Sequence, residues 1–260
     1  MNLFERKAVN MNKKELYNIW KREEEVAQIQ GWDFSHIEGR YDVENDLPWS
    51  YEEIVRSYLD NSKQIMDYDT GGAEFLLSLN HPYDKTAVTE GYKPNVELCK
   101  RRLLPLGINF KECSNPKNIP FEDEMFDLMI NRHGEFEQDE IYRLLKKDGI
   151  FIFSWHHPLN YCIAWSCDER KDVIENNTLV MNKSYFDESY FRMPVNGSEI
   201  LLCNRKISTY VNALAKAGFV IEKMVEQTDK VTMQMEGDIS NKAKKAKMFP
   251  ISVLFKARKL

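Results

Sequence analysis

Short apolar runs and amphipathic stretches alternate along most of this chain. The short runs predict β-strands at 65–67, 86–90, 108–112, 128–130, 150–155, 219–226 and 251–255. Stretches whose apolar residues recur at helical spacing predict helices at 12–30, 51–59, 73–79, 94–104, 138–147 and 207–216. Strands that alternate with helices are typical of an α/β protein in which helices cover a mostly parallel sheet. We therefore expect a doubly wound α/β sheet.

The regular alternation stops between residues 159 and 204. Aromatic residues stand there among acids and turn residues: Tyr161, Trp165, Tyr185, Phe186, Tyr190 and Phe191. An insertion of this composition between a strand and the next helix is typical of a substrate cover rather than of a linker. Two further tryptophans, Trp32 and Trp49, precede the first strand, where they either line such a cover or tie N-terminal helices to the sheet.

The clearest chemical signal surrounds the first two predicted strands. The first strand ends in Asp67, a turn through Asp69, Thr70 and Gly71 follows, and the second strand ends in Glu90. Ligands of a doubly wound sheet bind at the carboxyl ends of its strands, and an acid after the second strand accepts hydrogen bonds from ribose hydroxyls. The spacing therefore predicts a nucleoside site.

The same turn argues against a dinucleotide. A pyrophosphate needs a third glycine and the N-terminus of the following helix, but the corresponding position carries Glu74, whose charge repels phosphate. A nucleoside cofactor without a phosphate group fits this turn better.

These residues resemble the class I S-adenosylmethionine-dependent methyltransferases. The first motif of that family is D-x-G-x-G-x-G, and it matches Asp67, Asp69, Gly71 and Ala73, with Glu90 as the acid that ends the next strand. Asp69 and Ala73 stand where glycine is usual. The resemblance places the Asp69 carboxylate beside the methionine moiety, where it could hold the ammonium group or could crowd the site.

Later motifs of the same family follow in the correct order. The sequence has Asn115 before Ile119-Pro120-Phe121, then Phe126-Asp127-Leu128-Met129, and then Leu145-Lys146-Lys147-Asp148-Gly149-Ile150. The resemblance implies that Asn115 contacts the adenine edge, where the family usually has an acid. It implies eight cofactor-binding residues in all: Asp67, Asp69, Thr70, Gly71, Glu90, Gly91, Asn115 and Asn131.

The resemblance also implies an architecture. We expect a Rossmann-like, seven-stranded, mostly parallel sheet with an antiparallel C-terminal strand, in a single domain over residues 1–260. Its parts are an N-terminal helical cap (1–60), a cofactor-binding core (61–155), a substrate-cover insertion (156–204) and the C-terminal part of the sheet (205–260). No internal repeat and no shift in composition marks a second domain.

Three histidines fall at predicted carboxyl ends of strands, namely His133, His156 and His157. Histidine can accept a proton near neutral pH, so His133 and His157 are the candidate catalytic residues. A positioning or structural role is the alternative for each of them, and the favoured one. The grouping of His156 and His157 with Cys162 and Cys167 has no recognised zinc spacing, so we expect no metal site.

Charge and composition limit the kinds of binding partner and the cellular compartment to be expected. The net charge of −5 gives no general attraction to nucleic acid or to an anionic membrane, and the basic run 242–247 is interpreted as a solvated helix. The five cysteines are widely spaced without a C-x-x-C pair, which favours reduced thiols. No apolar run approaches the roughly 20 residues of a membrane span, and the N-terminus lacks the apolar core of a signal peptide. We expect a cytoplasmic protein, with its oligomeric state left open.

Two functions follow from these observations. The first is methyl transfer from S-adenosylmethionine to a small or medium organic acceptor, which the aromatic cover predicts to be apolar or aromatic. The second is a non-catalytic binding or scaffold protein that keeps the fold, because Asp69 and Ala73 depart from the glycine pattern where the backbone approaches the cofactor most closely.

Overall fold

The computed structural model describes most of the chain. The described residues are 12–26, 36, 38, 50–132, 134–163, 174–175, 178–179, 181, 183–195, 198–226, 228, 230–237, 239 and 241–260. His133, Trp32, Trp49, Trp165 and Cys167 lie outside them, so the predictions made for these residues are not addressed by the structure.

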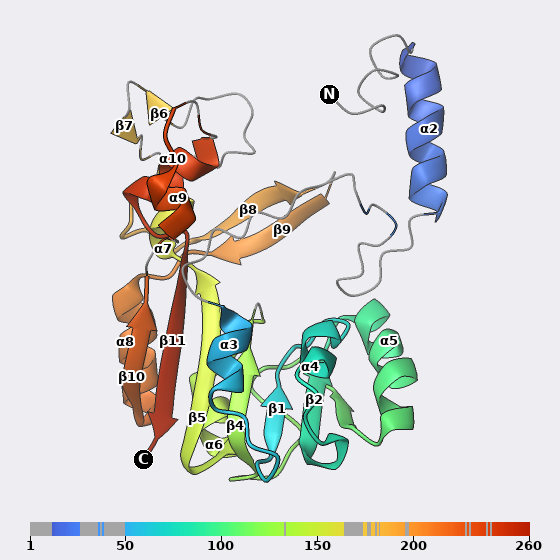
Figure 1. The fold of residues 1–260 in the computed structure, drawn as a ribbon, viewed down its shortest axis with the longest axis vertical. Helices are drawn as coiled ribbons and strands as arrows, with labels where there is room; N and C mark the ends of the chain where they lie inside the picture. The colour runs from blue at the N-terminus through green and yellow to red at the C-terminus, as the bar shows by residue number, and fades with distance from the viewer. Residues whose placement is uncertain are drawn as a thin grey trace.

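A seven-stranded sheet forms the centre of the molecule (Figure 1). Its strands are β1 (Ile65–Asp67), β2 (Thr86–Glu90), β3 (Asn109–Glu112), β4 (Phe126–Asn131), β5 (Leu145–His156), β10 (Phe219–Val225) and β11 (Ser252–Lys259). Their order is β10-β11-β5-β4-β1-β2-β3, and only β11 runs antiparallel to its neighbours. The predicted fold class, a Rossmann-like sheet with an antiparallel C-terminal strand, is confirmed.

Helices cover both faces of the sheet, as the alternating pattern predicts. They are α3 (Tyr51–Arg56), α4 (Glu74–Ser78), α5 (Lys93–Leu103), α6 (Gln138–Leu144) and α8 (Ile207–Ala217), with short 3-10 turns at Tyr83–Lys85 and Leu104–Leu106. A further helix, α2 (Lys13–Val26), contributes none of its described residues to the buried clusters of the sheet. One buried cluster joins the sheet to α6 and α8, and the other joins it to α3, α4 and α5. Each face therefore has its own apolar core.

The strand order reverses between β1 and β4. The chain moves from β1 to β2 and β3 on one side, and then returns to place β4 and β5 on the other side. In an open α/β sheet, ligands bind in the crevice at the carboxyl ends of the strands at such a reversal. The fold thus places its crevice beside Asp67 and Asn131, the last residues of β1 and β4.

Several predicted boundaries are wrong: the helix expected over 51–59 ends at Arg56, and the strand expected over 251–255 continues to Lys259. The helix expected over 138–147 ends at Leu144, because β5 begins at the fully buried Leu145. The register between β4 and β5 shifts between Phe126 and Leu128, and Asp148 adopts a left-handed φ of 63° in this irregular stretch. Helical spacing of the apolar residues continues past the true end of the helix, which explains the error.

The region between β5 and α8 contains small elements rather than a continuation of the sheet. They are α7 (Pro158–Cys162), β6 (Ile174–Glu175), β7 (Thr178–Leu179), and the hairpin of β8 (Tyr190–Val195) and β9 (Ser198–Cys203). The division of the chain into cap, core, cover and C-terminal part stays a prediction.

The basic run near the C-terminus differs from expectation. It forms α10 (Asn241–Met248), which follows α9 (Lys230–Gln234). This helix is not fully solvated, because Lys245 and Ala246 are buried. The Lys245 Nζ donates to the backbone oxygen of Asn160 at 3.3 Å, so the helix packs against α7.

Candidate active site

Backbone hydrogen bonds bring the turn after β1 into contact with both neighbouring strands. The amide of Tyr68 donates to the oxygen of Ile130 at 3.0 Å, and the amide of Thr70 donates to the oxygen of Thr89 at 3.1 Å. The amide of Asp69 donates to the Thr89 hydroxyl at 3.2 Å. The turn is therefore fixed over the point where the strand order reverses.

Three positions of this turn have a left-handed backbone. Asp69 has a φ of 57°, Gly71 of 70° and Ala73 of 63°. These are the three positions at which the methyltransferase motif carries glycine, so the chain keeps the backbone shape of the motif although two of the glycines are replaced. A non-glycine residue in this region costs roughly 1 kcal/mol, which the surrounding hydrogen bonds offset.

Glu90 is held at the tip of β2 by backbone donors. Its side chain accepts hydrogen bonds from the amides of Gly71 at 2.7 Å, Gly91 at 2.9 Å and Tyr92 at 2.7 Å. The residue is 2% exposed. The position of its carboxylate is thus determined by the β1 turn on one side and the approach to α5 on the other.

Gly91 is required by a close approach of two loops. A Cβ atom at this position would lie 2.5 Å from the backbone oxygen of Cys113. The Cys113 amide in turn donates to the backbone oxygen of Glu90 at 2.9 Å. The loop that carries Asn115 is therefore tied to the same edge of the sheet.

Asp67 and Asp69 carry perturbed carboxyl groups. Burial raises the pKa of Asp67 to about 7, although the Thr70 hydroxyl donates to it at 2.6 Å and the nearby Arg132 opposes the rise. Burial, followed by repulsion from Glu90, raises the pKa of Asp69 to about 6. Within the part of the chain that the structure describes, none of these three acids forms an ion pair. We call Asp67, Asp69 and Glu90 the carboxylate cluster.

The side chain of Asp69 fits only because of a glycine opposite it. A Cβ atom at Gly134 would lie 2.5 Å from the Cβ of Asp69 and 2.6 Å from its Oδ2. Gly134 belongs to the loop after β4, so this contact joins that loop to the carboxylate cluster.

Asn131 supplies a buried acceptor beside the turn. Its Nδ2 donates to the backbone oxygen of Tyr68 at 3.4 Å, and the residue is fully buried. Among the described residues, its Oδ1 has no hydrogen-bond partner. Buried polar atoms are nearly always paired, so an orphan acceptor at this edge fits the binding of a ligand that donates hydrogen bonds.

Arg132 is a site residue that the sequence analysis did not single out. Its guanidinium lies 4.7 Å from the ring centre of Phe75 and 5.9 Å from that of Tyr51. The Tyr51 hydroxyl lies 3.1 Å from the backbone oxygens of both Asn131 and Ile152, which fixes α3 over the ends of β4 and β5. Arg132 follows β4 directly, and this position was the only signal for it in the sequence.

The other predicted site residues lie less centrally. Asn115 is exposed, and its side-chain oxygen accepts from the amide of Lys117 at 3.0 Å. His157 is 4% exposed: its Nδ1 accepts from the amide of Leu159 at 3.2 Å and caps α7, while its Nε2 lies 2.8 Å from Glu226. Burial lowers the pKa of His157, against the effect of Glu226. Both ring nitrogens are therefore engaged by the protein.

A cavity of about 460 Å³ opens beside the carboxylate cluster. Its wall includes Gly134, the end of β5 at Phe153 and Trp155, the strand β9, and Tyr210 of α8. Gly134 also lies opposite Asp69, so the loop after β4 separates the cavity from the turn; none of the described lining residues belongs to the turn itself. Its volume is in the range of small-molecule sites.

The fold of this chain is similar to that of solved S-adenosylmethionine-dependent methyltransferases. The predicted resemblance to the class I methyltransferases is confirmed at the level of the fold. An S-adenosylmethionine-dependent methyltransferase from Mesorhizobium loti has a TM-score of 0.57 at 17% identity, covering 80% of this chain and 96% of that one. Geranyl diphosphate C-methyltransferase from Streptomyces coelicolor, in complex with Mg²⁺, geranyl diphosphate and S-adenosyl-L-homocysteine, has a TM-score of 0.51 at 13% identity, covering 80% and 78%.

Sequence similarity reaches part of the chain. This chain is 29% identical over 116 residues to phthiotriol/phenolphthiotriol dimycocerosates methyltransferase of Mycobacterium tuberculosis. The match covers 41% of this chain and 42% of that relative, less than half of either protein. No model of a known protein family matches the sequence.

Two further properties concern the described residues alone. None of their helices combines the length and apolar composition needed to cross a bilayer. They also contain no group of three or more histidine, cysteine, aspartate or glutamate side chains arranged to hold a metal ion.

Proposed function

We propose that this protein transfers the methyl group of S-adenosylmethionine to a small or medium organic acceptor. The observation that carries the proposal is the turn after β1, whose left-handed positions coincide with the glycine positions of the methyltransferase motif and whose Gly71 amide meets Glu90. The likeness of the fold to S-adenosylmethionine-dependent methyltransferases supports it.

The carboxylate cluster and its neighbours fit this cofactor. Glu90 would accept hydrogen bonds from the ribose hydroxyls, and Asn115 would contact the adenine edge. A carboxylate offers about four acceptor positions, and three amides already use Glu90. One ribose hydroxyl would use the remaining position and a second would displace one of the three amides, so binding of both requires a small local movement.

The methionine end carries both signs of charge, and so does the edge of the sheet beside β1. Asp67 and Asp69 would hold the ammonium group, whereas the Arg132 guanidinium would hold the carboxylate. The orphan oxygen of Asn131 adds a hydrogen-bond acceptor between them. Gly71 and Thr70 would shape the backbone around the same group.

Methyl transfer from this cofactor does not require a covalent intermediate with the protein. The cofactor would supply a methyl group already activated by a sulfonium, so the residues of the chain have to orient the acceptor and exclude water. His133 and His157 are the candidate proton acceptors. Because both ring nitrogens of His157 are engaged, we propose His133 as the residue that accepts the proton of the acceptor, and a positioning role for His157.

The cavity supports an apolar or aromatic acceptor. Phe153, Trp155 and Tyr210 form much of its wall. Geranyl diphosphate, the ligand of one structural neighbour, also carries an apolar chain. The acceptors of the relatives support only this general class of acceptor for the present chain.

A non-catalytic binding protein is the second candidate, and Asp69 favours it. Its carboxyl group occupies space beside Gly134 and Glu90 at the position where the family carries glycine. If Asp69 blocks the site, the substitution Asp69→Gly creates cofactor binding that the natural protein lacks.

Calorimetry with S-adenosylhomocysteine separates the two candidates. The methyltransferase proposal predicts micromolar binding by the natural protein and similar or weaker binding by Asp69→Gly. Undetectable binding by the natural protein, restored in Asp69→Gly, would establish the binding-protein alternative. A methyl-transfer assay with labelled cofactor then tests His133→Ala against His157→Ala, with a larger loss of kcat expected for His133→Ala.

A further inference from the structure

The walls of the cavity beside the carboxylate cluster are mainly apolar. Phe153 and Trp155 of β5, Leu202 of β9 and Tyr210 of α8 line it. Phe153 belongs to the buried aromatic core, with its ring 5.0 Å from that of Phe255, so this wall is rigid. Such a cavity accommodates the hydrocarbon or aromatic body of a ligand.

One cation interrupts this apolar lining. Among the described residues that line the cavity, Arg205 is the one lysine or arginine. It lies in the segment between β9 and α8, and its guanidinium lies 5.7 Å from the ring centre of Tyr190. A guanidinium is therefore held against aromatic surface at the cavity wall.

Within the described residues, the guanidinium of Arg205 interacts with Glu188, Cys203 and the hydroxyl of Tyr190. Its Nη1 donates to the backbone oxygen of Glu188 at 3.4 Å and contacts the sulfur of Cys203. Sulfur is a poor acceptor, and a guanidinium has five N–H donors in a planar fork. The backbone oxygen of Glu188, the sulfur of Cys203 and the hydroxyl of Tyr190 use part of these five donors, and the others remain for a ligand.

The nearest acid does not neutralise Arg205. The Glu188 carboxylate lies 2.9 Å from the Lys206 Nζ and accepts from the Thr209 hydroxyl at 2.6 Å. Arg205 forms no ion pair within the described part of the chain. Glu188 thus has its close contacts with Lys206 and Thr209, and Arg205 lines the cavity without an ion pair among the described residues.

The two acids in the cavity wall stand elsewhere in the chain. Glu135 and Glu137 belong to the loop that begins at Gly134, beside the turn after β1. Glu135 is exposed, and Glu137 lies 3.8 Å from the Lys117 Nζ. The negative side of the cavity therefore lies on the loop shared with the carboxylate cluster, and the positive side lies on the segment before α8.

We propose that this cavity is an acceptor site for an amphiphilic anion, a ligand with an apolar or aromatic body and one carboxylate or phosphate group bound by Arg205. Arginine binds both groups through paired N–H donors. Such a ligand would place its apolar body along Phe153 and Trp155. The inference rests on the proposed methyl transfer only in naming the ligand an acceptor, since the binding site itself is defined by the cavity and Arg205.

Binding of three matched probes tests the proposal. The probes are naphthalene-2-carboxylate, the neutral naphthalene-2-carboxamide and 2-naphthyl phosphate, each titrated into the full chain by calorimetry. We expect at least one of the anions to bind about tenfold or more tightly than the carboxamide, because a charged hydrogen-bonded pair contributes about 1.5–3 kcal/mol. The better of the two anions identifies the group that Arg205 accepts.

Two variants assign the preference to Arg205. Arg205→Met keeps the apolar stem and should bind anion and carboxamide equally, whereas Arg205→Lys should keep part of the preference because the charge remains without the planar fork. The affinity for S-adenosylhomocysteine should be unchanged in both, which also shows that they are folded. If Arg205→Met fails to fold, Arg205→Lys decides the matter: a reduced preference for the anion supports the assignment, and an unchanged preference overturns it.

The outcomes separate this inference from the proposed function. Equal binding of the anions and the carboxamide by the natural protein, a preference that survives in Arg205→Met, or no binding of any probe at millimolar concentration would overturn the inference. Binding of an anion through Arg205 without any binding of S-adenosylhomocysteine would support the site and reject the methyltransferase proposal. Binding of S-adenosylhomocysteine without a preference for the anions would support the methyltransferase proposal and reject the anion site.

Discussion

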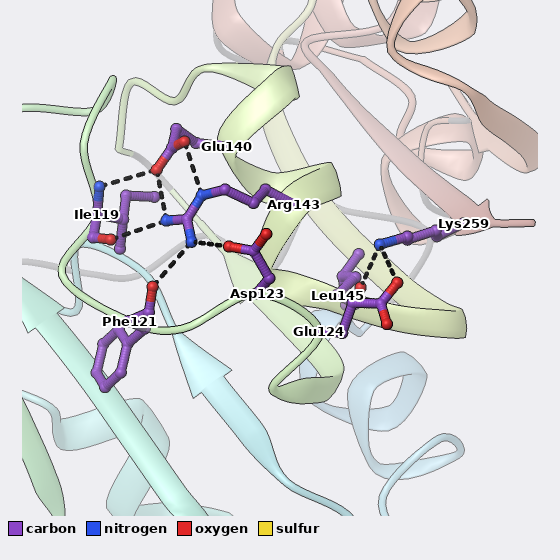
Figure 2. A network of polar contacts seen from close by, with 8 residues as sticks. All are labelled: Ile119, Phe121, Asp123, Glu124, Glu140, Arg143, Leu145 and Lys259. Atoms are coloured by element: carbon purple, nitrogen blue, oxygen red, sulfur yellow. Dashed lines mark hydrogen bonds and ion pairs between the residues drawn. The ribbon is translucent and has the colours of Figure 1, made fainter.

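Two groups of charged residues in this molecule have opposite chemistry. The carboxylate cluster gathers Asp67, Asp69 and Glu90 at the carboxyl ends of β1 and β2. The second group surrounds Arg143 of α6, between that helix and the loop before β4, and Figure 2 shows it. Both groups lie against the same sheet, and they differ in how far their charges are paired within the protein.

The charges around Arg143 are satisfied within the protein. Its guanidinium donates to the backbone oxygens of Ile119 and Phe121 at 2.9 Å, to Asp123 at 2.7 Å, and to Glu140 at 2.8 and 2.9 Å (Figure 2). These hydrogen bonds lower the pKa of Glu140. We call these five residues the Arg143 network.

The carboxylate cluster is the reverse case. Burial, with a smaller contribution from the neighbouring acids, raises the pKa of Asp67 to about 7 and that of Asp69 to about 6, and neither carboxyl has an ion pair among the described residues. Groups with shifted pKa values and incomplete pairing are typical of sites that bind a ligand. We propose that the Arg143 network stabilises the fold, whereas the carboxylate cluster binds the cationic part of the cofactor.

The largest effect on stability is expected from a substitution that removes the Arg143 network. Arg143→Met removes five hydrogen bonds at once and leaves Glu140 without its cation, so we expect the free energy of unfolding to fall by about 3 kcal/mol. Urea unfolding of the variant measures this, and its cofactor affinity should change little. A loss below about 0.5 kcal/mol would show that the network is not a source of stability.

The next effect concerns the cofactor. Glu90→Gln keeps the size of the side chain but loses its charge, and we expect the affinity for S-adenosylhomocysteine to fall about 30-fold, or about 2 kcal/mol. Glu112→Gln, at the end of the neighbouring strand β3, is the matched control. An equal loss in both variants would remove Glu90 from the site.

A smaller effect, of opposite sign on stability, is expected for Asp67→Asn. The pKa of this buried carboxyl is raised from an ordinary value near 4 to about 7, so the folded protein holds the proton more tightly than the unfolded chain does. Its contribution to stability is fully present below about pH 4 and is lost as the pH rises through about 7.

Asp67→Asn should therefore stabilise the protein by about 1–2 kcal/mol at about pH 8, and the gain should shrink at about pH 5. Urea unfolding at the two pH values measures both numbers. The same variant should bind the cofactor more weakly, because a carboxylate that would hold the ammonium group is gone. Destabilisation at the higher pH would contradict the account of Asp67.

The smallest effect is expected at an exposed ion pair. The Lys100 Nζ lies 3.1 Å from Glu97 and 3.2 Å from Glu112 on the surface. Exposed pairs contribute little because solvent screens them. Lys100→Met should leave both urea unfolding and cofactor binding unchanged, which makes it the control for Arg143→Met.

The sequence predicted those features that are encoded locally. The strand ends at Asp67 and Glu90 and the turn between Asp69 and Gly71 follow from spacing within short stretches, whereas the seven-stranded sheet was implied by the family resemblance. The left-handed positions of the turn agree with the glycine pattern although Asp69 and Ala73 replaced the glycines.

Features that join distant parts of the chain were missed. The Tyr51 hydroxyl meets the backbone of Asn131, 80 residues away, and of Ile152, 101 residues away, and no local pattern encodes such a bond. The stacking of Arg132 on Phe75 and the contact of Gly134 with Asp69 depend on the same kind of packing. The place of His157 at the edge was predicted, but its engagement by Glu226 depends on a strand 69 residues further along.

The most direct test of the carboxylate cluster is the release of protons when S-adenosylmethionine binds. Calorimetry at about pH 6.5 in two buffers of different ionisation enthalpy measures it, because a bound cation shifts Asp67 and Asp69 toward their charged forms. We predict the release of about half to one proton, with tighter binding at about pH 7.5 than at about pH 5.5. Binding with the same heat in both buffers and the same affinity at both pH values would contradict the claim that these acids are held for a cationic cofactor.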